Sequence, residues 1–211
     1  MFSAPYDSRW APRRHLPITD KANALTGLYI FAAIAIVAII VTVLFNQLIS
    51  KRQMVNNGWA DIDVQLKRRA DLIPQLVTTV QAYAAHERQL FEDVAEKRNA
   101  ALAAGNNATQ RGEAESALSK PVGRLIALGE AYPELKANQN FLDLQKELSE
   151  TENKIEMARR FYNGAVRELN TAVESFPSNV VAGGFGMGKR AFFEITAAGD
   201  RDVPILGLNP Q

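Results

Sequence analysis

Apolar residues follow two distinct patterns along this chain of 211 residues. An uninterrupted apolar run without any charged residue extends from residue 25 to residue 45. Beyond it, to about residue 176, apolar residues recur at every third or fourth position, which is the period of an amphipathic helix. No strand-like alternation separates these stretches. The pattern predicts an all-α protein with an N-terminal transmembrane helix, followed by an elongated antiparallel bundle of three to four helices.

The apolar run has the length of a membrane span. At 1.5 Å per residue a helix over 25–45 is about 31 Å long, which matches the hydrocarbon core of a bilayer. A cleaved signal peptide has a shorter apolar region and a small-residue cleavage site, whereas Asn46, Gln47 and Lys51 follow this run. A buried core helix is the other alternative. We expect residues 25–45 to contact membrane lipid. Basic residues flank the two ends of this run almost equally, so the sequence does not decide which side of the membrane the bundle faces.

The first amphipathic stretch extends from the anchor to about Ala103. Its apolar positions are Leu48, Val55, Trp59, Ile62, Leu66, Ile73, Leu76, Val80, Tyr83, Leu90 and Val94. Pro74 lacks an N–H and disturbs a helix. Because no glycine or turn cluster accompanies it, we favour one kinked helix over a hairpin; if the helix breaks, Asp71 is placed to cap its restart.

Two further helices are predicted after the loop at Gly105–Thr109. The shorter one ends near Tyr132-Pro133, and the longer one begins at Asn138 as N-cap and ends at Phe176–Asn179. The expected organisation is a disordered arm over 1–24, the membrane helix over 25–45, the bundle over 46–176, and a C-terminal tail over 177–211 that is partly docked on the bundle.

The tail contains the glycine-rich segment Gly183–Gly188. A dinucleotide fingerprint needs a preceding strand, and a P-loop needs Ser or Thr after Gly-Lys, whereas Arg190 follows here. We therefore interpret the segment as a flexible link. Phe185, Phe192 and Phe193 either fold the tail back onto the bundle, which we favour, or form a partner-binding patch.

Charge and chemistry exclude several classes of protein. Lys and Arg number 24 against 23 Asp and Glu, so no net field favours nucleic acid. Cysteine is absent, and the two histidines, His15 in the arm and His86 on a helix, form no ligand pair. The sequence predicts no catalytic, cofactor-binding or metal-ligating residues, and a protein that is not an enzyme.

The basic run Lys67-Arg68-Arg69 has two interpretations: a solvated face, or a contact surface. On a straight helix Lys67 would lie about 33 Å beyond Phe45, far more than a Debye length of about 8 Å. We therefore favour a protein contact, or bridging between bundle helices, over contact with lipid. We also expect some charged residues beside the apolar stripes to pair between helices and fix their register. These residues are Glu130, Glu152, Arg159 and Arg160.

The run Asp61–Pro74, with the sequence DIDVQLKRRADLIP, closely resembles the signature of the LemA family. The further matching blocks are Glu130–Asn138 with Phe141, Thr151–Ile155, Ala158–Asn163 and Ser175–Asn179. They keep the family's order over roughly Asn46 to Glu194. The resemblance implies a bacterial membrane protein with one anchor and a helical bundle, and no assigned catalytic residues.

These inferences predict a single-pass protein of the bacterial inner membrane that acts as a scaffold or adaptor for protein partners of unknown identity. Homo-oligomerisation is compatible with long helices and with the small anchor residues Ala32, Ala33, Ala35 and Ala38. One alternative is membrane remodelling by lateral self-association. A second, implied by the resemblance, is an accessory role beside a membrane-bound protease.

Overall fold

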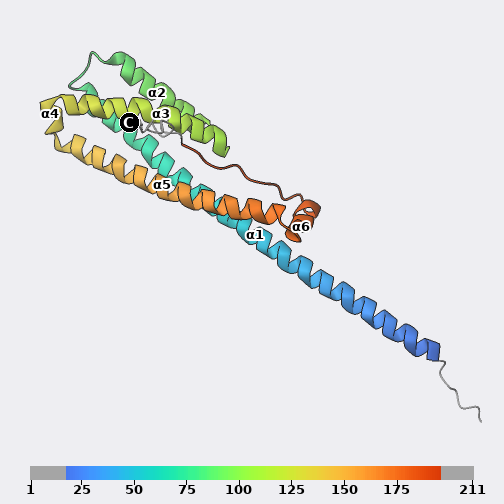
Figure 1. Ribbon diagram of the computed structural model, residues 1–211. Coiled ribbons are helices and arrows are strands. Elements are labelled where there is room, and N and C mark those ends of the chain that lie inside the picture. The colour runs from blue at the N-terminus through green and yellow to red at the C-terminus, as the bar shows by residue number, and fades with distance from the viewer. Residues whose placement is uncertain (1–17, 196–211) are drawn as a thin grey trace, which may run out of the picture. The chain divides into compact units, whose positions relative to one another are not determined.

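The computed structural model describes residues 18–195, and within them every regular element is a helix (Figure 1). The helices are α1 Ile18–Gln81, α2 Arg88–Ala103, α3 Ala108–Ala131, α4 Pro133–Lys136, α5 Gln139–Glu174 and α6 Ser178–Gly184. The predicted all-α class is confirmed. The chain divides into two compact units, Met1–Phe45 and Asn46–Gln211.

The first unit contains the N-terminal part of α1. Its apolar side chains are exposed, from Leu25 through Phe31 to Val43. By length and composition this is a candidate membrane span, and none of its most apolar window is buried, which contradicts the alternative of a core helix. The helix begins at Ile18 rather than at residue 25 because an established helix gains one hydrogen bond for each residue added. Residues 1–17 of the predicted arm lie outside the described residues.

The second unit is the bundle, in which α1 from Asn46 onward, α2, α3 and α5 run alternately up and down (Figure 1). Its buried apolar residues form two clusters. The first cluster joins α1, α2, α3, α4 and α5 through residues such as Ile73, Val94, Leu125, Leu135 and Phe141. The second joins α1, α5 and the segment after α6 through residues such as Ile62, Val166 and Phe193.

The prediction of one kinked helix up to Ala103 is wrong in its second half. α1 continues through Pro74 and ends at Gln81, and a short turn precedes α2. In that turn the N–H groups of Tyr83 and Ala84 both donate to the Val80 carbonyl, at 3.0 Å. The reversal lets α2 bury its apolar stripe in the same cluster as Val80 and Ala84. That burial stabilises the structure more than further helical hydrogen bonds would.

A side chain from α2 compensates for the proline inside α1. Pro74 has no N–H, so the carbonyl of Ala70, four residues earlier, lacks its helical donor. Arg98 of α2 donates its Nε–H to this carbonyl at 2.6 Å. The proline therefore creates an acceptor on α1 that ties α2 to it, and the helix needs no break at this position.

The remaining helix boundaries follow local chemistry. Asn107 caps α3 by accepting from the N–H groups of Thr109 and Gln110, after a turn in which Gly105 has φ +64. Asn138 caps α5 by accepting from Phe141 N–H, as predicted. The link predicted over 183–188 is partly helical, since α6 includes Gly183 and Gly184; the chain leaves this helix through Gly186 at φ +65.

We predict that Pro74 and Arg98 are energetically coupled. Arg98→Leu should destabilise the bundle by about 1.5–3 kcal/mol because it removes a charged donor from a partly buried carbonyl. In the Pro74→Ala background the restored N–H satisfies Ala70, so the same change should cost much less. The measurement is urea unfolding of the full chain in detergent, followed by the fluorescence of Trp59 with Trp10→Phe in every variant. Equal costs in both backgrounds would contradict the coupling.

Candidate functional site

A buried ion-pair network centred on Arg69 of α1 joins three helices. The Arg69 side chain is 1% exposed. Its Nη1 lies 3.2 Å from Oε2 of Glu115 in α3, and its Nη2 donates to Ser119 Oγ at 2.9 Å. Its Nε lies 2.9 Å from Oε1 of Glu152 in α5. One guanidinium thus connects α1, α3 and α5.

Glu115 lies between two guanidinium groups. Nε of Arg111, one turn earlier in α3, donates to Glu115 Oε1 at 3.1 Å, while Arg111 Nη2 lies 3.8 Å from Oδ1 of Asp63 in α1. Burial raises the pKa of the Glu115 carboxyl, and the charges of Arg69 and Arg111 oppose that rise. The arginines therefore provide the pairing that a buried carboxylate requires.

The geometry of this network suits the alignment of three helices. Both Glu115 oxygens and the two terminal nitrogens of Arg69 have partners within the protein, while Arg69 Nε lies near the Glu152 carboxylate without a hydrogen bond to it. Neither surface hollow described below is lined by these residues. A group that must attack a substrate or shuttle a proton has to be accessible to it, and these groups are not.

The structure resolves the two interpretations of the basic run 67–69. Arg69 is buried and bridges helices, and Arg68 Nη2 lies 3.6 Å from Oε2 of Glu147 in α5, so the bridging interpretation is confirmed for these two residues. Lys67 is exposed.

The four charged residues expected to pair between helices behave differently. Glu152 pairs with Arg69 of α1, as expected. Glu130 of α3 accepts from Gln145 Nε2 of α5 at 2.7 Å. Arg159 donates to the Ile195 carbonyl in the tail, and Arg160 pairs with Glu156 within α5. Glu152 and Glu130 therefore link helices, Arg159 secures the tail, and Arg160 makes only a local pair.

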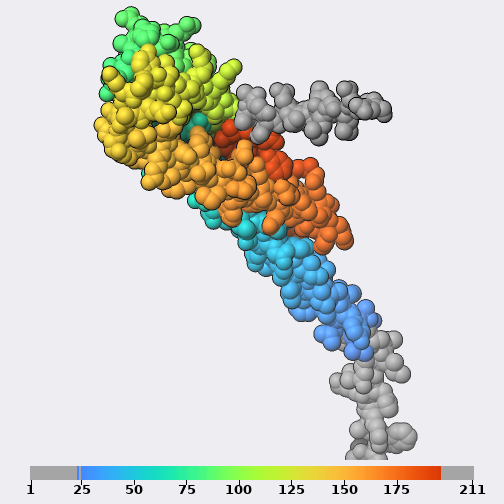
Figure 2. Space-filling model, turned by 60° about the vertical axis from the view of Figure 1, so that its left-hand side comes forward, coloured from blue at the N-terminus to red at the C-terminus, as the bar shows by residue number. Residues whose placement is uncertain are grey.

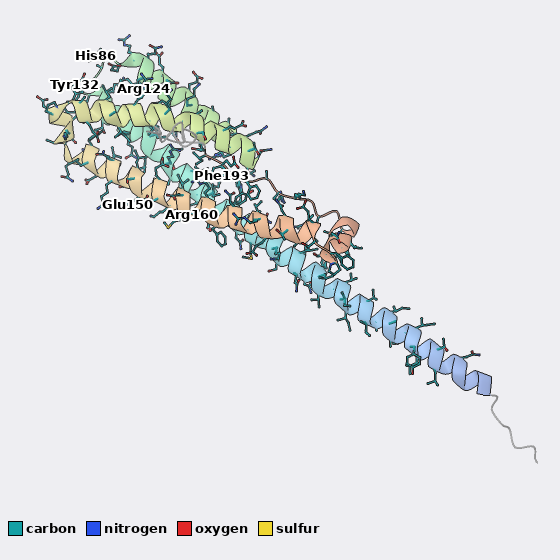
Figure 3. The ribbon with its side chains drawn as sticks, viewed as in Figure 1. His86, Arg124, Tyr132, Glu150, Arg160 and Phe193 are labelled. Carbon is teal, nitrogen blue, oxygen red and sulfur yellow. The ribbon has the colours of Figure 1, made fainter. Side chains whose placement is uncertain are left out.

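His86 lies in the turn before α2 and is exposed (Figure 3). Its Nε2 is 3.3 Å from the Tyr132 hydroxyl and 4.0 Å from Oε1 of Glu87. A nearby hollow of about 490 Å³ is lined by Glu87, Gln89, Leu90, Glu92, Asp93, Glu96 and Arg124. Among residues 18–195, no three His, Cys, Asp or Glu side chains converge on a point where they could hold a metal ion.

The segment after α6 lies along α5 as an extended strip, which Figure 2 shows in red against the orange helix. Two asparagines of α5 hold it. Asn163 donates to the Phe193 carbonyl at 3.0 Å and accepts from Phe193 N–H at 2.9 Å; Asn170 does the same for Arg190, at 2.9 and 2.8 Å. Each side-chain amide therefore replaces the hydrogen bonds of a neighbouring strand.

Phe193 anchors this strip in the core. It is completely buried, and its ring centroid lies 5.8 Å from that of Trp59, which also contacts Tyr162 at 5.6 Å. The Tyr162 hydroxyl donates to the Ala191 carbonyl at 2.9 Å. Phe185 and Phe192, by contrast, are exposed. The sequence points to Phe193 as a docking residue but assigns no contact to Asn163 or Asn170, although their spacing of seven residues places both on one face of α5.

An exposed apolar surface lies along the seam between α1 and α5. A Cβ built on Gly58 of α1 would lie 3.0 Å from Cδ1 of Phe161 in α5, so the Phe161 ring packs over Gly58. Met54 is one turn before Gly58, and Met157 is one turn before Phe161. These three side chains, which we call the seam patch, are 38% (Met54), 56% (Met157) and 48% (Phe161) exposed.

The chain is similar to known proteins over most of its length. The LemA family model matches residues 58–206, more than half of the chain. The chain is 24% identical to magnetosome protein MamQ 2 of Paramagnetospirillum magneticum, covering 88% of this chain and 76% of that protein. It is 22% identical to magnetosome protein MamQ of Magnetospirillum gryphiswaldense, covering 85% and 75%. It is 24% identical to protein LemA of Metamycoplasma hominis, covering 75% and 72%.

We predict that Arg69→Met destabilises the bundle by about 3–5 kcal/mol, because it removes one of the two guanidinium partners of a buried carboxylate. Lys67→Met, two residues earlier and exposed, is the control and should change stability by less than about 0.5 kcal/mol. The double variant Arg69→Met/Glu115→Gln should recover part of the loss. Unfolding in urea with Trp59 as the probe measures all three. Similar effects of Arg69→Met and Lys67→Met would rule out the register role.

We also predict that Phe193→Ala releases the strip from α5. Loss of the buried ring should shift Trp59 emission to longer wavelength and speed hydrogen exchange at residues 190–195 by at least about tenfold. Phe192→Ala, at the preceding exposed position, should leave both signals close to wild type. Unchanged exchange in the Phe193 variant would show that the asparagine clamps alone hold the strip.

Proposed function

The chain belongs to the LemA family, and from that membership we propose that it is a single-pass scaffold of the bacterial cytoplasmic membrane that recruits other proteins. In this proposal residues 25–45 anchor the chain in lipid, and an exposed face of the bundle binds a partner. No chemical step is assigned to it.

The anchor part of the proposal is supported by exposure and length. Large apolar side chains along residues 25–43 face outward in the described structure, where water would meet them at a high free-energy cost. A helix satisfies its own backbone hydrogen bonds, so lipid is the environment that suits this segment. Its length of about 31 Å is sufficient to cross a bilayer.

The seam patch is the observation that carries the recruitment proposal. Methionine side chains are flexible and polarisable, and they are over-represented at surfaces that bind partner helices. Here two of them flank an aromatic ring that is positioned by Gly58 beneath it. Single exposed apolar residues are common on proteins, whereas three on one seam between two helices offer a continuous apolar surface to a partner.

The pairing of the buried charges supports a non-enzymatic role. The buried charged residues of the described bundle are Arg69, Arg111 and Glu115, and these pair with one another or with adjacent side chains. An enzyme would need an accessible polar group that is free to act on a substrate.

A second candidate function is membrane organisation by lateral self-association. It is favoured by the similarity to two proteins named as magnetosome proteins, each covered over about three quarters of its length. In this candidate, the occupant of the seam patch is a second copy of the chain.

We predict that a photo-crosslinker placed at Phe161 in the full chain, in native membranes, captures a different protein in a discrete band. Phe161→Asp combined with a crosslinker at Met157 should reduce that band at least about fivefold, since an apolar contact does not accept a buried charge. A crosslinker at Val64, which is exposed on α1, is the position control. A band at twice the chain mass instead supports self-association. Absence of any band specific to positions 157 and 161 would contradict both candidates.

A further inference from the structure

A basic hollow lies where the segment after α6 meets α1 and α5. It has a volume of about 250 Å³ and is lined by Arg52 of α1, Leu169 of α5 and the segment Gly186–Arg190. Its charged lining residues are Arg52, Lys189 and Arg190, all cationic. This arrangement suits an anion, and neither the register network nor the seam patch accounts for it.

The positive charge of the hollow is only partly neutralised by nearby acids. Lys51 pairs with Glu168 at 2.9 Å, and Lys189 pairs with Glu174. Within residues 18–195, Arg52 and Arg190 form no ion pair with an acidic side chain. Two guanidinium groups therefore remain available, and their planar fork of donors matches the oxygens of a phosphate group.

The hollow is held in place before any ligand arrives. Asn170 fixes the backbone of Arg190 by two hydrogen bonds, at 2.8 and 2.9 Å, and Phe193 anchors the following residues in the core. Met187 N–H donates to the Ala182 carbonyl at 2.9 Å and closes the turn after α6. Because the backbone of this segment is already ordered, binding an anion needs ordering of the cationic side chains but not of the chain that carries them.

Covalent connection keeps the hollow near the membrane anchor. Arg52 is seven residues beyond Phe45, so even a fully extended chain would keep it within about 25 Å of the end of the apolar run. This reach allows Arg52 to come within a Debye length, about 8 Å at physiological salt, of the anionic headgroups that attract basic residues.

The same part of the chain exposes apolar side chains beside these cations. Phe176, just after α5, is 82% exposed, and Val180 of α6 is 67% exposed. Val180 lies within α6, the helix that leads into the hollow, and Phe176 lies two residues before that helix begins at Ser178. Exposed aromatic and aliphatic groups next to arginines are typical of surfaces that enter the headgroup region of a bilayer.

From this juxtaposition we propose that Arg52, Lys189 and Arg190 form a binding site for the phosphate of an anionic phospholipid headgroup, with Phe176 and Val180 entering the interface beside it. The inference rests on the anchoring part of the proposed function and is independent of protein recruitment. Free phosphate shares the chemistry of the headgroup, but the covalent reach from the anchor and the exposed apolar side chains favour lipid.

The test is hydrogen exchange of the full chain in nanodiscs. One set contains phosphatidylcholine only and the other about 30 mole per cent phosphatidylglycerol, both at low salt. We expect residues 176–190 to exchange at least about threefold more slowly in the phosphatidylglycerol discs, and about 0.5 M salt to remove the difference. Equal exchange in the two discs would overturn the proposal.

Variants assign the effect to the hollow. Arg52→Gln/Arg190→Gln should abolish the protection, whereas Arg124→Gln, at the acidic hollow of α2 and α3, should retain it (Figure 3). Trp59 emission, which reports on the core next to Phe193, checks that each variant is folded. Protection that survives in the double variant would overturn the assignment to these arginines.

One further result distinguishes lipid from free phosphate as the source of the anion. A second distinguishes headgroup binding from protein recruitment. Protection produced in phosphatidylcholine discs by about 10 mM inorganic phosphate would identify a site for soluble phosphate and overturn the lipid assignment. Crosslinking from Met157 in native membranes is scored separately for the Phe161→Asp variant. Loss of its partner band, with the lipid protection of the same variant intact in nanodiscs, separates protein recruitment from headgroup binding.

Discussion

The bundle depends on a charge that it cannot leave unpaired. Arg69 lies where an apolar side chain would otherwise continue the stripe of α1, and its guanidinium is satisfied only when Glu115 of α3 and Glu152 of α5 are in register with it. Sliding any of these helices by one turn, about 5.4 Å, would leave a buried charge without its partner. Apolar stripes alone tolerate such slippage, because one leucine can take the place of another. The guanidinium group of Arg69 does not tolerate it, because its donors need acceptors at fixed positions. The ion pairs therefore contribute specificity of alignment, while apolar burial supplies most of the free energy.

The same reasoning explains the proline in α1 and the tail. In each case a backbone group that lacks a regular partner is satisfied by a side chain from another element: Arg98 for the Ala70 carbonyl, and Asn163 for Phe193. Arginine and asparagine serve because each offers donors at a fixed geometry beyond the reach of the local backbone. α2 and the C-terminal strip are thus attached by polar contacts that are specific in position, and apolar contacts with the two clusters complete them.

Much of the fold is predictable from periodicity, and part of the network is as well. Arg69 lies three residues after Leu66 and four before Ile73, so it fills a gap in the stripe of α1; Glu115 precedes Leu118 by three in α3. A charged residue at such a position in the apolar pattern is expected to face the interior of the bundle. The turn after Gln81 was missed because the apolar spacing stays in phase across it and no glycine or proline marks it. Asn163 and Asn170 were missed because asparagine on a helix face has no preferred role until its partner strand is known.

The position of the tail links the core to the surface. Phe193 belongs to the same cluster as Val55, Ile62 and Tyr162, and Arg190 is three residues before it in an extended strip. The orientation of Arg190 therefore depends on the packing of Phe193 and on Asn170 rather than on the local preference of a glycine-rich segment. A loosened core would release the strip and with it two of the three cations of the basic hollow. Gly186, at φ +65, allows the chain to turn there, and the packing of Phe193 determines the direction of the strip that follows.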